Sequence, residues 1–252
     1  GSGLVGSEMC IRDREHIDWP RLLALCEKEP PALPVQPEMP PARVRIAVAQ
    51  DEAFCFIYAE TLEAFRDAGA EVVFFSPLRD TALPENIGGL YLPGGYPELH
   101  ARELSENTSL LREIKRKIDS GLPTAAECGG FLYLGQSLTD AEGQSWPMAG
   151  VLPGEAKDAG RLVRFGYATL SADSDSMLFR AGESFPIHEF HHWDSTANGT
   201  ALAAKKPVGG AAWRCGFINE HFYAGFPHLY WAGTPLPQRF AAAAENYRRD
   251  HD

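Results

Sequence analysis

Hydrophobic and polar positions follow a repeating order from residue 44 onward, in which short apolar runs are separated by longer amphipathic segments. The apolar runs, which predict buried strands, are residues 44–49, 72–75, 89–93 and 123–127. The amphipathic segments, which predict helices, are residues 54–68, closed by Gly69, about 97–120, and a final one at about 237–249. From about residue 150 to this last helix, strands and turns dominate. Because apolar strands that alternate with helices form parallel sheets covered on both faces, we predict an α/β fold with a doubly wound, mostly parallel sheet.

The first 42 residues differ from this pattern. Residues 16–28 predict a short amphipathic helix, and six prolines between positions 30 and 41 predict an extended linker over 29–42. Residues 1–14 show no periodicity, and we interpret them as a non-native or artefactual tail. We therefore expect one large domain over 43–252, and a linker so near the start indicates that another domain precedes it.

The composition narrows the classes of protein to which the chain can belong. Its 252 residues suffice for one large domain, and its hydrophobic (44%) and charged (23%) shares are those of a globular protein. The formal net charge of -11 argues against nucleic acid as a partner, since nucleic acid needs a basic surface. No apolar run approaches the ~20 residues that span a bilayer, and no secretory signal is evident, so we expect no membrane partner and a cytoplasmic location.

The five cysteines give one candidate for chemistry. They are Cys10, Cys26, Cys55, Cys128 and Cys215. An odd count at wide spacings, without a CxxC pair, indicates reduced thiols and argues against a disulfide framework or a zinc site. Most such cysteines are small buried hydrophobic residues, and only Cys128 has a local context that indicates reactivity.

The segment around Cys128 predicts a reactive thiol. Residues 124–127 form a short strand of small residues, and Gly129 and Gly130 precede an apolar segment that can begin a helix. Such a strand-to-helix turn places a sulfur at the positive end of a helix dipole, where thiols ionise readily, and the glycines leave room for a substrate carbonyl. Glu127 points to the opposite side of the strand, which favours a supporting or buried-partner role over that of a catalytic acid.

A thiol nucleophile also needs a base and hydrogen-bond donors for an oxyanion. His228 follows the apolar stretch 217–226, at the kind of turn where a base can face the nucleophile, although a histidine bonded within a loop is the plainer alternative. Gly94 and Gly95 lie in a Pro-Gly-Gly loop that can present backbone N–H groups, with Gly129 as a second source. By itself such a loop is most often only a turn.

These three segments occur in an order that resembles the class I glutamine amidotransferase domain, over about residues 43–232. The resemblance implies a flavodoxin-like fold and hydrolysis of L-glutamine to glutamate and ammonia through a γ-glutamyl thioester. It implies that Cys128 is the nucleophile and that His228 is its base. The oxyanion and glutamine-binding residues that it implies are Gly94, Gly95 and Gly129.

One position departs from most of that class. A glutamate usually follows the histidine by two residues and orients its ring, whereas this position is Tyr230. The cobalamin-pathway branch of the class dispenses with that acid, so the departure narrows the resemblance. What orients the His228 imidazole is left open.

Two longer motifs resemble the cobyrinate a,c-diamide synthases of that branch: Pro-Gly-Gly-Tyr-Pro-Glu at 93–98 and His-Glu-Phe-His at 188–191. The resemblance implies that ammonia is used to amidate the a and c carboxylates of cobyrinate or hydrogenobyrinate. The partner that it implies is therefore a corrinoid acid. A homodimer is a possible assembly. The resemblance also implies ATP and Mg²⁺ in an N-terminal domain. No GxxxxGK[ST] loop occurs in this chain, so no cofactor is expected in it. Residues 15–28 are then a remnant of that domain. The residues assigned to a substrate or interdomain surface are Tyr96, Glu98, His188, Glu189 and His191.

Other interpretations stay open at this point. The glutaminase could serve cobyric acid synthase, a nickel-sirohydrochlorin diamide synthase or a lipid amidase, or the chain could be a stand-alone thiol hydrolase or a scaffold without activity. Residues 188–192 also match the H-E-x-x-H pattern of zinc hydrolases. Phe185 and Pro186 indicate a strand, in which His188 and His192 lie ~13 Å apart, so we predict no metal site.

Overall fold

The computed structural model describes residues 16–27 and 41–251. The predicted tail at 1–14 and most of the predicted linker at 29–42 lie outside the described residues.

The chain divides into one unit up to Glu38 and a second unit from Met39 onward. In the first unit, the predicted helix forms as α2 (Trp19–Cys26). The Asp18 side chain begins this helix by accepting a hydrogen bond from the Arg21 amide at 3.1 Å. None of the residues of α2 is buried.

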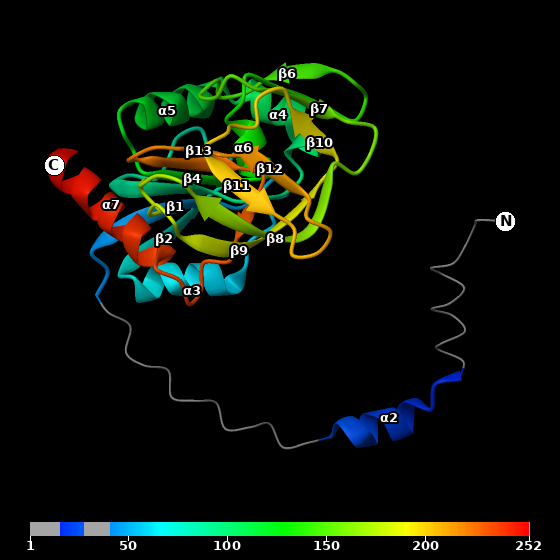
Figure 1. Ribbon diagram of the computed structural model, residues 1–252. Coiled ribbons are helices and arrows are strands. Elements are labelled where there is room, and N and C mark those ends of the chain that lie inside the picture. Colours follow the sequence, from blue (N-terminus) through cyan, green and yellow to red (C-terminus); the bar gives the residue numbers. More distant parts are fainter. Residues whose placement is uncertain (1–15, 28–40, 252) are drawn as a thin grey trace. The chain divides into compact units, whose positions relative to one another are not determined.

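The second unit is built on a six-stranded sheet (Figure 1). Its strands are β1 (Val44–Ala49), β2 (Ala70–Phe75), β3 (Ile87–Leu92), β4 (Thr124–Glu127), β13 (Phe217–Ile218) and β14 (Phe222–Gly225). They lie in the order β13-β14-β4-β3-β1-β2, and every neighbouring pair is parallel except β13 with β14. The four strands predicted before Cys128 all form, and the predicted mostly parallel sheet is confirmed.

Side chains alternate between two hydrophobic cores, one on each face of this sheet. On β1, Ala47 contributes to one core and Val48 to the other, and on β4 Ala126 and Ala125 divide in the same way. The helices of the first core are α4 (Ala101–Glu106), α5 (Thr108–Asp119) and α6 (Gly129–Tyr133), and those of the second are α3 (Ala59–Asp67) and α7 (Leu236–His251). Figure 1 shows α5 and α3 on opposite sides of the sheet, as the doubly wound prediction requires.

The helix predicted over 54–68 is shorter than expected, since only Ala59–Asp67 (α3) is helical and the residues before it are not. The Phe56 amide donates to the Gly94 carbonyl at 3.1 Å in an isolated bridge, which holds the preceding residues in an extended conformation. The predicted end is right: Gly69 follows the helix with φ 85°, a left-handed conformation that suits glycine.

The helix predicted over 97–120 is divided into a 3₁₀ turn, η1 (Pro97–His100), and the helices α4 and α5. The last two separate at Asn107. Its side-chain amide donates to the carbonyls of Pro77 (2.9 Å) and Asp80 (2.8 Å), and this tie to a distant loop competes with helix continuation.

The later part of the chain forms two further sheets, in agreement with the predicted excess of strands. The strands of the five-stranded antiparallel sheet, in spatial order, are β12 (Ala212–Cys215), β11 (Leu202–Lys205), β8 (Arg164–Ala172), β9 (Ser184–His191) and β15 (His228–Leu229). Those of the four-stranded sheet are β10 (Trp193–Ser195), β7 (Glu155–Asp158), β5 (Ser137–Thr139) and β6 (Ser145–Pro147). Because β15 pairs with β9, His228 lies opposite His188.

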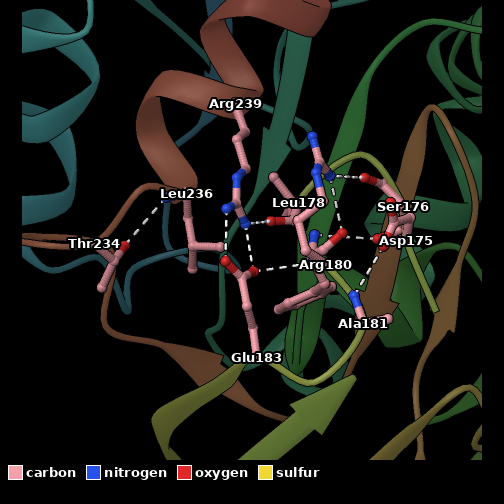
Figure 2. Close-up of polar contacts among 10 residues, drawn as sticks. Asp175, Ser176, Leu178, Arg180, Ala181, Glu183, Thr234, Leu236 and Arg239 are labelled. Atoms are coloured by element: carbon pink, nitrogen blue, oxygen red, sulfur yellow. Dashed lines mark hydrogen bonds and ion pairs between the residues drawn. The ribbon is translucent and has the colours of Figure 1, made fainter. Parts of the chain in front are cut away.

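An ion pair joins the predicted C-terminal helix, α7, to the turn before β9 (Figure 2). Arg239 of α7 donates to both carboxylate oxygens of Glu183, at 2.6 and 2.7 Å, and to the Leu178 carbonyl at 2.8 Å. The Arg180 amide donates to the same carboxylate at 2.9 Å. Side-chain hydrogen bonds from Arg239 hold the pKa of Glu183 at about 2, well below its usual 4.5.

Candidate active site

Cys128 stands on a sharp turn between β4 and α6. Its φ of 47° is in the left-handed region that residues with a side chain rarely adopt. Two backbone hydrogen bonds hold it there, from the Cys128 amide to the Gly225 carbonyl (2.8 Å) and from the Leu132 amide to the Cys128 carbonyl (3.0 Å). A Cβ on Gly130 would stand 2.1 Å from the Leu92 carbonyl oxygen, so the turn needs glycine there. The predicted strand-to-helix elbow is confirmed, and its strain is concentrated at the thiol.

His228 lies close enough to Cys128 for the sulfur to interact electrostatically with the imidazole. The imidazole is 5% exposed, and the edge of the Phe56 ring contacts it with the ring centroids 4.6 Å apart. A Cβ on Gly94 would stand 2.4 Å from Cε1 of His228, so only glycine lets the ring lie against this loop. Burial alone would lower the pKa of His228, but the Cys128 sulfur and the Glu127 carboxylate outweigh it and raise the pKa to about 10.

Glu127 is a buried carboxylate, 1% exposed, as the predicted supporting role requires. The donors to its oxygens are the Trp231 indole (2.8 Å) and the Leu229 amide (3.4 Å) at Oε1, and the Tyr91 hydroxyl (3.1 Å) at Oε2. The same Oε2 lies 3.7 Å from Nδ1 of His228. The carboxylate therefore faces the imidazole that the sulfur also contacts.

Tyr230 occupies the position where most class I amidotransferases carry an acid. Its side chain is 46% exposed, and its ring lies 6.2 Å from that of Tyr58. It supplies no charge to His228.

The glycines predicted for the oxyanion site bring two loops together beside the sulfur. A Cβ on Gly129 would stand 3.0 Å from the Gly95 amide nitrogen, so the backbones of these two residues are in close contact. A Cβ on Gly95 would stand 2.1 Å from the Ala53 carbonyl oxygen, so this loop also lies directly on the segment before α3. The structure thus places both predicted donors next to Cys128.

A cavity of about 110 Å³ opens beside the Cys128 sulfur. Gly95 and Gly129 line it together with Tyr96 and Glu98, and His191 of β9 completes part of the wall. Burial raises the pKa of Glu98 to about 7, while Tyr96 is half exposed. Two of the residues predicted for substrate contact, Tyr96 and Glu98, therefore lie at the thiol itself.

The other predicted substrate residues do not share one surface, because the pleat of β9 divides them. His188 is partly buried beside His228, with the ring centroids 6.5 Å apart. Glu189 and His191 point to the other side and are only 2% and 7% exposed. Glu189, predicted for a substrate or interdomain surface, is buried in this structure, since alternate residues of a strand face opposite sides and its side packs inward.

Glu189 and His191 instead form a second buried acid–histidine pair, with Oε2 and Nε2 3.7 Å apart. Because His188 to His191 lie on a strand, the helical spacing that two zinc-binding imidazoles need is absent from this segment. Within residues 16–27 and 41–251, no three histidine, cysteine, aspartate or glutamate side chains are placed to hold a metal ion. No helix in these residues is long and apolar enough to cross a bilayer.

Three aromatic residues of the site were not predicted from the sequence. Phe56 packs on the imidazole, and Tyr91 and Trp231 hold the Glu127 carboxylate. Trp231 follows His228 by three residues, which is a weak local signal. Phe56 and Tyr91 reach the site only through strand pairing and a loop that no local pattern identifies.

Comparison with known proteins gives a consistent result. Residues 45–235 match the sequence profile of the CobB/CobQ-like glutamine amidotransferase domain. The chain is 44% identical over 251 residues to the cobyrinate a,c-diamide synthase of Synechocystis sp. This alignment covers 93% of this chain and 50% of that protein. It is 39% identical over 216 residues to the one from Caldanaerobacter subterraneus, with 84% of this chain and 48% of the relative covered. The chain thus spans about half the length of the curated relatives that it matches.

Solved structures agree at the level of the fold. The structure of PurLQS from Thermotoga maritima superposes with a TM-score of 0.54 at 19% identity, over 81% of this chain and 98% of that one. A glutamine amidotransferase from the same organism gives 0.52 at 13% identity, over 83% and 85% of the two chains. At such identities the likeness shows a shared fold alone, which is the predicted class I amidotransferase-like fold.

Proposed function

The chain belongs to the CobB/CobQ-like glutamine amidotransferase family, and on that basis we propose that it is the glutaminase part of a cobyrinate a,c-diamide synthase. In this role it hydrolyses L-glutamine and supplies ammonia for the ATP-dependent amidation of the a and c carboxylates of cobyrinate or hydrogenobyrinate. Relatives that carry this name and cover most of the chain support the pathway. The observation that carries the glutaminase assignment is the contact between the strained Cys128 elbow and the buried His228.

The proposed reaction begins with transfer of the Cys128 thiol proton to His228. The sulfur then attacks the amide carbon of glutamine, and the negative charge that develops on the oxygen is stabilised by the amides of Gly95 and Gly129. His228 gives the proton to the leaving nitrogen, and ammonia departs from a γ-glutamyl thioester. A water molecule, deprotonated by His228, cleaves the thioester to glutamate and restores the thiol.

We assign glutamine to the cavity that opens at the sulfur. Its side-chain amide must lie between Cys128 and the two glycine amides, which leaves the α-amino and α-carboxylate groups toward Tyr96 and Glu98. Glu98 is the acidic group on this wall, so it would pair with the α-ammonium. Because burial raises the pKa of Glu98 to about 7, a bound ammonium is expected to keep it ionised near neutral pH.

ATP and Mg²⁺ belong, in this proposal, to a domain outside this chain. The chain has no GxxxxGK[ST] loop, so its own residues do not fit a phosphate site of that type, and we derive no phosphoryl step from them. Residues 43–252 are then the amidotransferase domain, 29–42 a linker, and 15–28 the remnant of the ATP-binding domain. We place the protein in the cytoplasm, and a homodimer stays a prediction.

The test uses the purified chain and a glutamine analogue that carries a diazoketone, 6-diazo-5-oxo-L-norleucine. The analogue is expected to alkylate Cys128 stoichiometrically, as seen by peptide mass, and L-glutamine is expected to yield equal amounts of glutamate and ammonia. Cys128→Ala should lose both reactions, whereas Cys215→Ala, which alters another buried thiol, should keep both. Glutamine hydrolysis by Cys128→Ala at the wild-type rate would rule the mechanism out.

A second experiment, an amidation assay, tests the pathway. The chain is combined with the half of the Synechocystis relative that it does not cover, together with ATP, Mg²⁺ and cobyrinate. We expect the a,c-diamide with glutamine as the nitrogen source, and with free ammonia alone when Cys128→Ala is used. Amidation of a different acid in the same assay, and not of cobyrinate, would contradict the pathway while leaving the glutaminase assignment intact.

A further inference from the structure

The carboxylate of Glu127 faces a ring nitrogen of His228 that has no other partner. Nδ1 of His228 is buried without a hydrogen bond, and Oε2 of Glu127 lies 3.7 Å from it. This is an ion-pair distance, and a small rotation of either side chain shortens it to a hydrogen bond. With Nδ1 on the carboxylate, Nε2 is the nitrogen left for the Cys128 sulfur. We propose that Glu127 is the positioning residue that orients the His228 imidazole for the reaction at Cys128.

The Glu127 carboxylate is held in place more firmly than a long side chain would be by itself. Its two oxygens accept hydrogen bonds from Trp231, Leu229 and Tyr91, and its side chain is 1% exposed. It also precedes Cys128 directly, so the nucleophile and the carboxylate leave opposite faces of one strand end. Any movement of that strand end therefore moves the nucleophile and the carboxylate together.

The chemistry required of such a residue follows from the two states of the imidazole. In the neutral imidazole, a carboxylate at Nδ1 favours the tautomer with its proton on Nδ1, so Nε2 is the nitrogen that takes the thiol proton. The raised pKa of His228 favours completion of this transfer at neutral pH before the sulfur attacks. After the transfer, the carboxylate stabilises the imidazolium. The proton that reaches Nε2 later leaves with ammonia, so Glu127 itself gains and loses no proton. This inference rests on the proposed glutaminase function and adds to it the group that the sequence left open.

No other described acid contacts this imidazole. The titratable groups that face His228 are Cys128 and Glu127 from the elbow and His188 from the paired strand β9. The charge of His228 lowers the pKa of His188, as does burial, which is the larger effect, so His188 cannot serve as the negative partner. Phe56 and Gly94 contact the ring without a charge, and they only limit the space in which it can lie.

The first experiment needs no turnover. The ring protons of His228 are titrated by NMR in Cys128→Ala and in Cys128→Ala/Glu127→Gln, so that the coupling to the thiol is removed from both. Glu127→Gln is expected to lower the pKa of His228 by about one unit or more, because the amide cannot stabilise the imidazolium. The matched control is Cys128→Ala/Glu189→Gln, which removes the other buried glutamate and should leave this titration unmoved. An unchanged His228 titration in Glu127→Gln would overturn the proposal.

The second experiment measures catalysis in the chain with its thiol intact. Glu127→Gln is expected to lower kcat for glutamine by about 100-fold or more with KM within about twofold, because ring orientation matters in the transition state. Glu127→Asp, which keeps the charge on a shorter arm, should lose less than Glu127→Gln. Tyr91→Phe removes a donor to the carboxylate and leaves the charge, so its loss should be below about 10-fold. Equal losses in Tyr91→Phe and Glu127→Gln, with His228 titrating alike in all, would show a merely structural role and refute the proposal.

Two further outcomes are distinguishable. Should Glu127→Gln not fold, Glu127→Asp decides by the same readouts: wild-type kcat together with a wild-type His228 titration would overturn the proposal. Should the wild-type chain neither hydrolyse glutamine nor react with its diazoketone analogue, the glutaminase function fails, and the His228 titration in the Cys128→Ala background still decides whether Glu127 controls the imidazole.

Discussion

The described residues contain two buried glutamate–histidine pairs with the same separation, made through Nδ1 of His228 and through Nε2 of His191. In one, Glu127 and His228 stand 3.7 Å apart, and in the other Glu189 and His191 do so. Each glutamate accepts a hydrogen bond from a tryptophan indole, Trp231 at 2.8 Å for the first and Trp213 at 3.3 Å for the second. The pairs differ in what the second ring nitrogen meets.

In the first pair we assign that nitrogen, in the proposal above, to the Cys128 sulfur. In the second, Nδ1 of His191 contacts the Trp193 carbonyl at 2.7 Å, and the ring stacks on Phe226 with a centroid distance of 3.7 Å. His191 is therefore oriented by the backbone and by stacking. Among the described residues, the acceptor that faces Nδ1 of His228 is the Glu127 carboxylate, 3.7 Å away. The comparison teaches that the pair motif alone is not a catalytic signature; its neighbours decide its use.

The surroundings of the two glutamates differ as well. Glu127 has direct donors on both oxygens. Glu189 borders a polar cavity of about 50 Å³, into which Arg164 and Asn198 also present side-chain atoms without a hydrogen-bond partner. A cavity of this size and polarity suits bridging water, so the second pair is expected to relax more easily when it is altered.

The largest expected effect comes from removing each histidine in turn. His228→Asn should lower kcat for glutamine by about 1,000-fold, because the base is lost. His191→Asn should change kcat by less than about 10-fold and act mainly on stability and on KM, since this ring lines the cavity but has no part in the proposed proton transfers. Steady-state glutaminase rates and urea unfolding of both variants check this. Comparable kcat losses in the two would erase the distinction between the pairs.

The next effect concerns the shape of the His228 site. Gly94→Ala places a methyl group 2.4 Å from Cε1 of His228, so the ring must move off the sulfur. We expect kcat to fall by about 10- to 100-fold from misplacement of the base. The matched control is Gly89→Ala, where the new methyl meets only side-chain carbons at 3.3 to 3.4 Å. Wild-type kcat in Gly94→Ala would show that the imidazole position is not tightly set.

A smaller effect is expected from neutralising the second pair. Glu189→Gln keeps an acceptor for Trp213 and faces a polar cavity, so it should cost about 1 kcal/mol of unfolding free energy. Urea denaturation followed by tryptophan fluorescence measures it. A loss larger than that of Glu127→Gln in the same assay would mean that the second pair is the more tightly coupled of the two.

The smallest effect belongs to an ion pair at the surface, Glu183 with Arg239 (Figure 2). The pKa of Glu183 is lowered from 4.5 to about 2 by Arg239, so its contribution is complete above about pH 4.5 and is lost as the pH falls toward 2. Glu183→Gln should therefore cost about 0.5 kcal/mol at pH 7 and almost nothing near pH 2.

Unfolding curves at the two pH values check this prediction. The matched control is Glu245→Gln on α7, the helix that carries Arg239. The ion pair of Glu245 with Arg43 is more exposed, so its removal should cost less unfolding free energy. An equal cost of Glu183→Gln at both pH values would show that charge is not what holds the helix.

The sequence by itself determined the parts of this protein that depend on local order. Hydrophobic periodicity was enough for the strands before Cys128 and for the last helix, and the glycines around Cys128 were enough for the elbow. Periodicity could not show that Phe56 bridges to Gly94 or that Asn107 bonds to Pro77 and Asp80, since these contacts shorten or divide the helices from outside.

Only the tertiary structure decided which polar side chains meet. Glu127 and His228 are about a hundred positions apart, and parallel pairing of β14 with β4 and antiparallel pairing of β15 with β9 bring them together. The register of β9 also turns Glu189 inward, whereas Tyr230, which follows β15, is 46% exposed. The physical reason is that strand periodicity fixes which residues share a face, whereas only the pairing of distant strands fixes what that face meets.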